Sequence, residues 1–235
     1  MEGVYTYFGV IFGHEGSGLM MAHVTLVAII MLVLARAATK NMQAVPNGSQ
    51  NVMEAYLGGV IAMGKDVIGE ENARKYLPLV ATIGLFVFFS NLIGIIPGFE
   101  APTANINITL TLALLVFVYY HIEGVRAQGF LKYLGSFVHL GEMNPILKAG
   151  LTAFMYPIEI VSHISRIISL SFRLFGNIKG DDLFLWVLLM LAPWAVVPLS
   201  GYVLLTFGAI LQSFIFMILT YVYLAGAVVV SEDHH

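Results

Sequence analysis

Six polar residues recur at helical spacing within an otherwise apolar stretch in the C-terminal half of the chain. They are Glu159, Ser162, Arg166, Ser169, Arg173 and Asn177. Steps of three or four residues place side chains on one face of a helix. An arginine at the centre of a bilayer costs about 2.5–3.5 kcal/mol on insertion scales, so such residues usually face protein or water. The stripe therefore predicts a polar helix face that crosses most of a membrane and needs a partner surface.

Composition places the whole chain in a bilayer. Of its 235 residues, 59% are hydrophobic and only 11% are charged, whereas soluble domains carry about 25% charged residues. The expected fold class is an all-α polytopic membrane protein with a single membrane domain, 1–235. The chain has no cysteine, which excludes disulfides and thiolate metal sites. HExxH and GxxxxGK[ST] motifs are also missing, as are basic patches, so we expect no metal, cofactor, nucleotide or nucleic acid to bind.

Hydrophobic runs and turn residues predict about five transmembrane helices. The expected spans are residues 19–35, 76–96, 105–122, 144–178 and 183–230. Residues 51–69 are amphipathic, which suits a helix at the membrane surface or, equally, one packed on another subunit. A polar turn is expected at 179–182. The last region is too long for an upright span, because 48 residues would reach about 72 Å against a core of about 30 Å. It must break near Pro193 and Pro198 or run strongly tilted.

Basic residues indicate the orientation. Most of them fall in two connectors on the same side of the predicted membrane, namely Arg36, Lys40, Lys65, Arg74, Lys75, Arg126, Lys132 and Lys148. The opposite side has only Lys179. By the positive-inside rule the two connectors are cytoplasmic. Five crossings then place the N-terminus outside the cell and the C-terminus in the cytoplasm.

Three motifs occur in the order of a known family. They are NLIGIIPG from Asn91, followed by ANINITLTLAL; SLSFRLFGN over 169–177; and QSFIFMILTYVYLAGA from Gln212. Together they cover most of the chain from about Tyr76 onward. The sequence thus resembles the a subunit of F-type ATP synthases, the membrane stator beside the proton-carrying c ring. The resemblance implies a tilted hairpin of the last two helices against that ring. It also implies peripheral-stalk b subunits and the remainder of the complex as partners, and a plasma-membrane location.

The resemblance also implies roles for individual residues. Arg173 takes the place of the family's essential arginine, between two proton half-channels. Asp182 matches the outer acidic position and Glu159 the inner one. Gln212 and Asn177 are expected beside Arg173. Further half-channel lining is expected from Ser162, His163, Ser169, Asn105 and Asn107.

Several alternatives stay open on the residues themselves. Asp182 is also consistent with a solvated turn. Glu159 is also consistent with a residue at a helix start, stabilised by the helix macrodipole. Gln212 is also consistent with an ordinary interhelical hydrogen bond. Asn105 and its neighbours suit helix capping as well as an aqueous entrance. The family's second ionisable outer position is Leu205 here, so water, Tyr202, Thr206 or another helix must replace it. The role of Arg166 is open. The competing function is a free-standing cation-coupled transporter, and the sequence leaves H⁺ or Na⁺ undecided.

Overall fold

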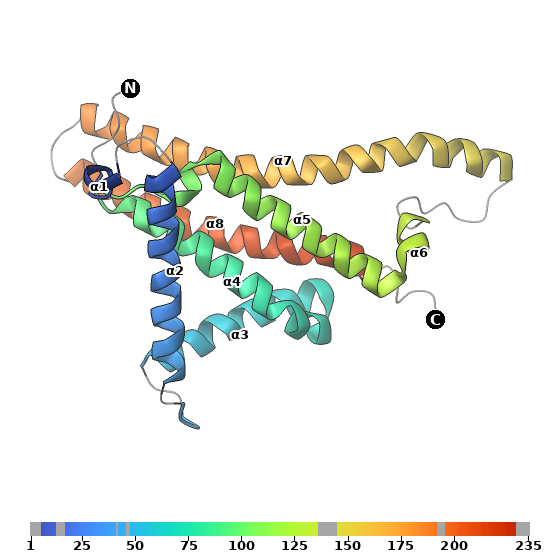
Figure 1. The fold of residues 1–235 in the computed structure, drawn as a ribbon, viewed down its shortest axis with the longest axis horizontal. Helices are drawn as coiled ribbons and strands as arrows, with labels where there is room; N and C mark the ends of the chain where they lie inside the picture. The colour runs from blue at the N-terminus through green and yellow to red at the C-terminus, as the bar shows by residue number, and fades with distance from the viewer. Residues whose placement is uncertain are drawn as a thin grey trace.

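The computed structural model describes residues 6–12, 17–40, 42–45, 48–135, 145–191 and 196–228. Within these ranges the chain is helical apart from turns and short connections, and it has no strand (Figure 1). The helices are α1 (Gly9–Phe12), α2 (Ser17–Thr39), α3 (Ser49–Ile68), α4 (Glu70–Ile95), η1 (Pro102–Ala104), α5 (Ile106–Gln128), α6 (Phe130–Gly135), α7 (Pro145–Leu191) and α8 (Val196–Val228). The predicted all-α class is therefore confirmed.

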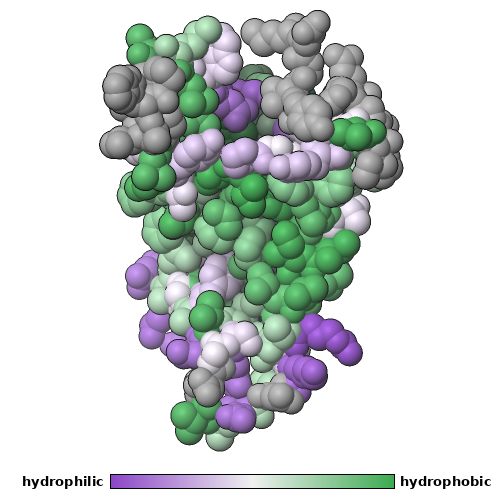
Figure 2. Space-filling view, turned by 90° about the vertical axis from the view of Figure 1, so that its left-hand side faces the viewer, coloured by the Kyte–Doolittle hydropathy of each residue, from purple (hydrophilic) through white to green (hydrophobic). Residues whose placement is uncertain are grey.

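Four of the described helices are long and apolar enough to cross a membrane. They cover Gly18–Thr39, Glu70–Ile95, Ile106–Gln128 and Leu199–Val228. Figure 2 shows the matching surface, with a broad hydrophobic band between hydrophilic ends. On α2 this apolar surface includes the exposed side chains of Met21, Ile29, Leu32 and Val33. The polytopic membrane architecture expected from the composition is confirmed.

The predicted turn at 179–182 is wrong, because α7 continues through these residues to Leu191. A single glycine within a helix costs only about 1 kcal/mol, and residues 179–182 contain no proline. The apolar residues that follow them continue the same helix. Helix α7 ends at Leu191 and α8 begins at Val196, and Pro193 lies outside the described residues. Pro198 is tolerated in the first turn of α8, where its missing N–H has no intrahelical partner to lose.

The last two helices form a long hairpin. The 47 residues of α7 span about 70 Å at 1.5 Å per residue. In Figure 1, α7 and α8 run antiparallel and lie crosswise to α2, and the first turns of α7 project beyond the other helices. With α2 perpendicular to the membrane, the hairpin is therefore steeply tilted. Residues 183–230, which are too long for an upright span, were expected to adopt such a tilt or to break.

Helix α8 lies at the centre of the packing and contacts α3, α4, α5 and α7. The main core joins these helices through buried apolar side chains, among them Val60, Val80, Val87, Val116, Leu170, Leu174, Phe216, Tyr221 and Leu224. Gly84 lets α4 approach α8 closely, since a side chain there would collide with Met217. At the same place the Ser213 hydroxyl donates to the Gly84 carbonyl at 2.7 Å. This packing holds α8, and with it Gln212, in a defined position.

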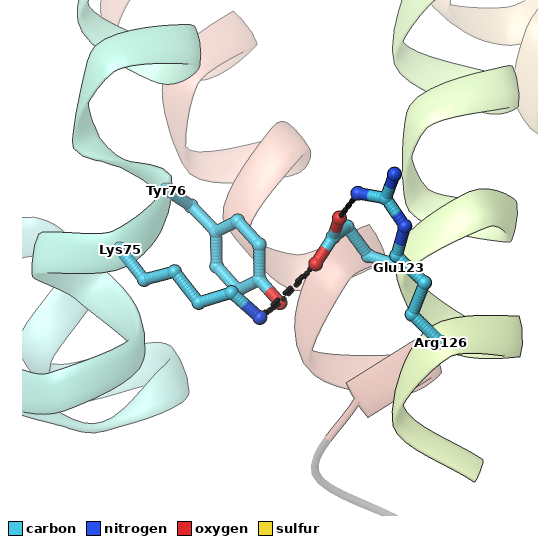
Figure 3. Close-up of polar contacts among 4 residues, drawn as sticks. All are labelled: Lys75, Tyr76, Glu123 and Arg126. Atoms are coloured by element: carbon cyan, nitrogen blue, oxygen red, sulfur yellow. Dashed lines mark hydrogen bonds and ion pairs between the residues drawn. The ribbon is translucent and has the colours of Figure 1, made fainter.

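A cluster of charged and polar side chains links α4 to α5 (Figure 3). The carboxylate of Glu123, 4% exposed, accepts from the Tyr76 hydroxyl at 3.1 Å and lies 3.0 Å from the Lys75 ammonium. Its other oxygen lies 2.8 Å from the Arg126 guanidinium. A buried carboxylate with several charge-assisted partners stabilises the pairing of the two helices.

We expect Glu123→Ala to lower the stability of this helix pair by about 1–3 kcal/mol, because a buried tyrosine hydroxyl loses its acceptor and two cations lose their counter-charge. The measurement is the temperature of heat-induced aggregation of the detergent-solubilised subunit. Lys75→Gln is the matched control, since Arg126 and Tyr76 keep their partner, and its effect should be smaller. Equal aggregation temperatures for Glu123→Ala and the unaltered chain would contradict this account.

Candidate functional site

The two polar positions of the hairpin meet across its interface. The Asn177 amide on α7 donates to the Gln212 side-chain oxygen on α8, and Gln212 is only 3% exposed. The Gln212 nitrogen has no hydrogen-bond partner among the described residues. A buried amide donor left unpaired costs about 1–3 kcal/mol, so Gln212 is a site where a further polar partner is stabilising. The interhelical hydrogen bond expected for Gln212 is thus present.

Arg173 lies one turn before Asn177 on the same helix face. Its side chain is half-buried, and the core residues Leu170 and Leu174 lie three positions before it and one after it on the same helix. Among the hydrogen bonds and ion pairs of the described residues, none involves Arg173. Because a guanidinium stays protonated in proteins, this helix carries a permanent charge without a counter-charge inside the described part of the chain. Such a group suits an anionic partner from outside the chain.

The Glu159 end of α7 carries a polar chain that joins α7 to α5. The Tyr120 hydroxyl lies 2.8 Å from Nδ1 of His163, and Nε2 of His163 lies 3.5 Å from Oε1 of Glu159. Arg166 lies over the Tyr223 ring, with Cζ 5.4 Å from its centroid. A cavity of about 60 Å³, the Glu159 cavity, lies here and is lined by Tyr120, Tyr133, Glu159, His163, Arg166, Gly226 and Ala227.

The Asp182 end of α7 meets a second, smaller cavity. This Asn91 cavity has a volume of about 20 Å³ and is lined by Asn91, Gly94, Ile95, Ala101, Ile178, Asp181, Asp182, Leu205 and Ala209. The Asp182 side chain is 57% exposed, and its Oδ2 lies 3.9 Å from the Lys179 ammonium. Asn91, 2% exposed, accepts from the Thr103 hydroxyl at 2.7 Å. The regions of α7 around Glu159 and Asp182 are therefore both polar, and Arg173 and Asn177 lie between them.

The remaining predicted residues occupy different places. Ser162 is half-buried on the Glu159 side of Arg173, and Ser169 is exposed. The Asn105 side chain caps α5 by accepting from the Asn107 N–H at 2.9 Å, so capping is confirmed for Asn105. It also borders a cavity of about 140 Å³, the His23 cavity, lined by Leu19, Met20, His23, Glu100, Ala101, Pro102 and Asn105. Asn107 itself is exposed.

Sequence reasoning missed Tyr120, Tyr133 and Asn91 as site residues. Tyr120 and His163 are 43 positions apart, and no spacing rule connects residues of two different helices. Asn91 had one signal, since it lies within an otherwise apolar run. The described residues contain no group of three side chains suited to hold a metal ion.

Comparison with known proteins agrees with this geometry. The sequence model of the ATP synthase A chain family matches residues 19–225. The chain belongs to the ATP synthase subunit a family. It is 63% identical over 233 residues to ATP synthase subunit a of a Nitratiruptor species, covering 99% of both chains. It is also 65% identical over 235 residues to that of a Sulfurovum species, covering 100% of this chain and 94% of the relative. A third relative, from Campylobacter fetus, is 65% identical over 213 residues and covers 90% and 91%.

Family membership establishes the coarse function. As an ATP synthase subunit a, the chain is a multi-pass membrane subunit of the F-type ATP synthase complex in the bacterial plasma membrane. It works in ATP synthesis and proton transport as part of the membrane sector. The resemblance expected from the three motifs is confirmed. The family match extends from α2 to the last turn of α8, so it includes both helices of the site.

Proposed function

We propose that this subunit is the ion-translocating stator of its ATP synthase, with two proton half-channels that meet a rotating c ring at Arg173. One observation carries the proposal: a permanently charged side chain, unpaired within the described residues, lies between two polar cavities on one helix. Water can reach the two ends of α7 through separate polar regions. A single continuous pore would dissipate the gradient, and the fixed charge of Arg173 opposes a proton that passes directly.

The face of the hairpin around Arg173 supports contact with a ring of helices. Large apolar side chains are exposed along both helices, including Val161, Ile168 and Phe172 on α7 and Val203, Phe207, Ile210 and Phe214 on α8. Apolar surface of this kind suits lipid and the apolar helices of c subunits. The arginine in its midst then attracts a deprotonated ring carboxylate. Peripheral-stalk b subunits and the rest of the complex are the further partners that we propose.

The implied cycle has four steps. A proton enters from outside at the Asp182 end, neutralises a ring carboxylate, travels around with the ring, and leaves at the Glu159 end into the cytoplasm. Arg173 forces the proton off the returning carboxylate, because a charged pair with the guanidinium is favoured over a neutral acid. Each charge that crosses 100 mV supplies about 2.3 kcal/mol. The chain itself is the non-catalytic part of this motor, and its N-terminus lies outside the cell and its C-terminus in the cytoplasm.

Single cysteines test the two half-channels directly. We expect Ser162→Cys and His163→Cys to react with a membrane-impermeant thiol reagent from the cytoplasmic face only. Asn177→Cys and Asp182→Cys should react from the outer face only. The chain has no native cysteine, so labelling of this subunit reports the introduced thiol alone. Right-side-out and inverted membrane vesicles that contain the whole ATP synthase supply the two faces.

Exposed residues on α2 provide the control for this assay. Ile29→Cys places a thiol on the apolar surface of α2, where Ile29 is 51% exposed, and we expect it to stay unlabelled from either side. Labelling of both position sets from one face would refute the half-channel assignment. Labelling of Ile29→Cys would show instead that the reagent had crossed the membrane.

A further inference from the structure

We infer that Asp181 is the side chain that accepts the incoming proton in the outer half-channel, in place of the ionisable group that Leu205 lacks. This inference rests on the proposed function and deepens it. The polar stripe of α7 continues from Arg173 through Asn177 to Asp181 at steps of four residues. Asp182 lies about 100° further around the helix, with its side chain 57% exposed. The face that carries Arg173 therefore presents Asp181.

The Asp181 carboxylate faces α8. A β-carbon on Gly208 would lie 3.7 Å from Oδ2 of Asp181, so this oxygen approaches the backbone of α8 at a glycine. Gly208 lies one helical turn before Gln212. Asp181 and Gly208 therefore lie opposite each other, one turn along the hairpin from Asn177 and Gln212. The carboxylate lies in line with the polar pair that follows Arg173 along the hairpin.

An unpaired buried donor borders the same space. Asp181 lines the Asn91 cavity, and so does Asn91, which is 2% exposed. The Asn91 oxygen accepts from Thr103, while its amide nitrogen has no hydrogen-bond partner among the described residues. A volume of about 20 Å³ accommodates one water molecule, which needs polar partners such as these. A water that accepts from the Asn91 amide and donates to the Asp181 carboxylate satisfies both groups.

The position of Leu205 explains why the carboxylate comes from α7. Leu205 is 6% exposed and lines the Asn91 cavity from α8, so an ionisable side chain there would enter this same space. Asp181 reaches it from the opposite helix. Ala101 borders both this cavity and the larger His23 cavity, where Glu100 and Asn105 are polar. The two cavities are therefore neighbours at Ala101.

The chemical step is a pair of proton transfers. A hydronium ion protonates the Asp181 carboxylate and leaves water behind. The Asp181 acid then passes this proton, through water beside Asn177, to a ring carboxylate and returns to its anionic form. Protons and charges balance, and no other reactant is required. Glu159 serves the opposite end of α7 and takes no part in these two transfers.

ATP synthesis driven by respiration in membrane vesicles tests the inference, with rates divided by the amount of assembled complex on native gels. We expect Asp181→Asn to lower the rate at least about tenfold, since a proton-transfer group typically contributes about 10²–10⁴-fold to a rate. Asp182→Asn is the comparison variant: it removes the neighbouring carboxylate, which lines the same cavity, and should lower the rate less than Asp181→Asn does. Asp181→Glu keeps a carboxyl group and should retain most of the activity.

A second variant separates proton transfer from folding. Leu205→Glu, added to Asp181→Asn, supplies a carboxylate from α8 to the same cavity and should restore a large part of the lost rate. Its dependence on the pH of the outer side should differ from that of the unaltered enzyme. Normal synthesis in Asp181→Asn, or loss in Asp182→Asn without loss in Asp181→Asn, would overturn the inference. Both results leave the proposed function standing, because that function is tested separately, by the cysteine labelling and by Arg173→Ala.

Discussion

Arg173→Ala is expected to abolish coupled ATP synthesis and ATP-driven acidification of membrane vesicles. Without the guanidinium, no fixed positive charge separates the two ends of α7, and a proton can pass from one half-channel to the other without turning the ring. The ring carboxylate also loses the group that draws its proton off. Because Arg173 has no ion-pair partner within the described residues, its loss removes charge from the site without leaving a stranded carboxylate in the chain. The expected loss is therefore functional and leaves the fold intact.

Two variants sharpen this experiment. Arg173→Lys keeps a positive charge but loses the planar group with five donors, so we expect it to retain little coupled activity. Arg166→Ala removes a second arginine from the same face of α7, one that already lies over the Tyr223 ring, and should leave measurable synthesis. Near-normal acidification in Arg173→Ala vesicles would contradict the proposed function. Equal losses of synthesis in Arg173→Ala and Arg166→Ala would mean that positive charge anywhere on the polar stripe is required, rather than Arg173 in particular.

The general architecture was predictable from the sequence because hydrocarbon imposes strong constraints. Long apolar runs such as residues 19–35 must form helices in a bilayer, since no water satisfies their backbone groups. The helical spacing of the polar stripe also predicted correctly that Asn177 and Arg173 share a face. One polar group on each of two apolar helices predicted that Gln212 faces Arg173, whereas the hydrogen-bond partner of Gln212 in the structure is Asn177, one turn further along α7.

Other features could not be predicted because they depend on packing between helices. Local polarity suggested a turn at 179–182, yet nothing in those residues breaks a helix, and α7 passes through them. That error also hid Asp181, because the periodicity of the stripe extends to it only if the helix is continuous. Tyr120 and Asn91 belong to other helices, and their places beside His163 and Asp181 follow from how α4, α5 and α8 pack.

The exposed apolar face of α7 and α8 was likewise not predictable from the sequence. The sequence shows that Phe172 and Phe207 are apolar. Their exposure of 58% and 57% is seen only in the folded structure of the single chain. Core residues of similar size, such as Phe216 and Tyr221, are almost fully buried. The difference identifies the side of the hairpin that remains for lipid and for other subunits.

A loss of about tenfold in ATP-driven pumping is expected for His163→Leu. In the arrangement that satisfies both contacts, the Tyr120 hydroxyl donates to Nδ1 of His163 at 2.8 Å. Nε2 of His163 lies 3.5 Å from Oε1 of the Glu159 carboxylate. Leucine removes both contacts, so Glu159 loses the group that orients it toward the Glu159 cavity. A proton-transfer group that is out of position typically loses one or more powers of ten in rate.

The matched variants decide what His163 does. His163→Gln keeps a hydrogen-bond donor and acceptor but cannot carry a proton, and we expect it to retain at least about half of the rate, because His163 orients Glu159 without itself being protonated. His121→Leu is the control, since its ring lies 5.0 Å from that of His163 and its Nδ1 contacts the Phe117 carbonyl of its own helix at 2.9 Å. It should pump normally. A loss in His163→Gln as large as in His163→Leu would show that the imidazole itself carries the proton to the cytoplasm.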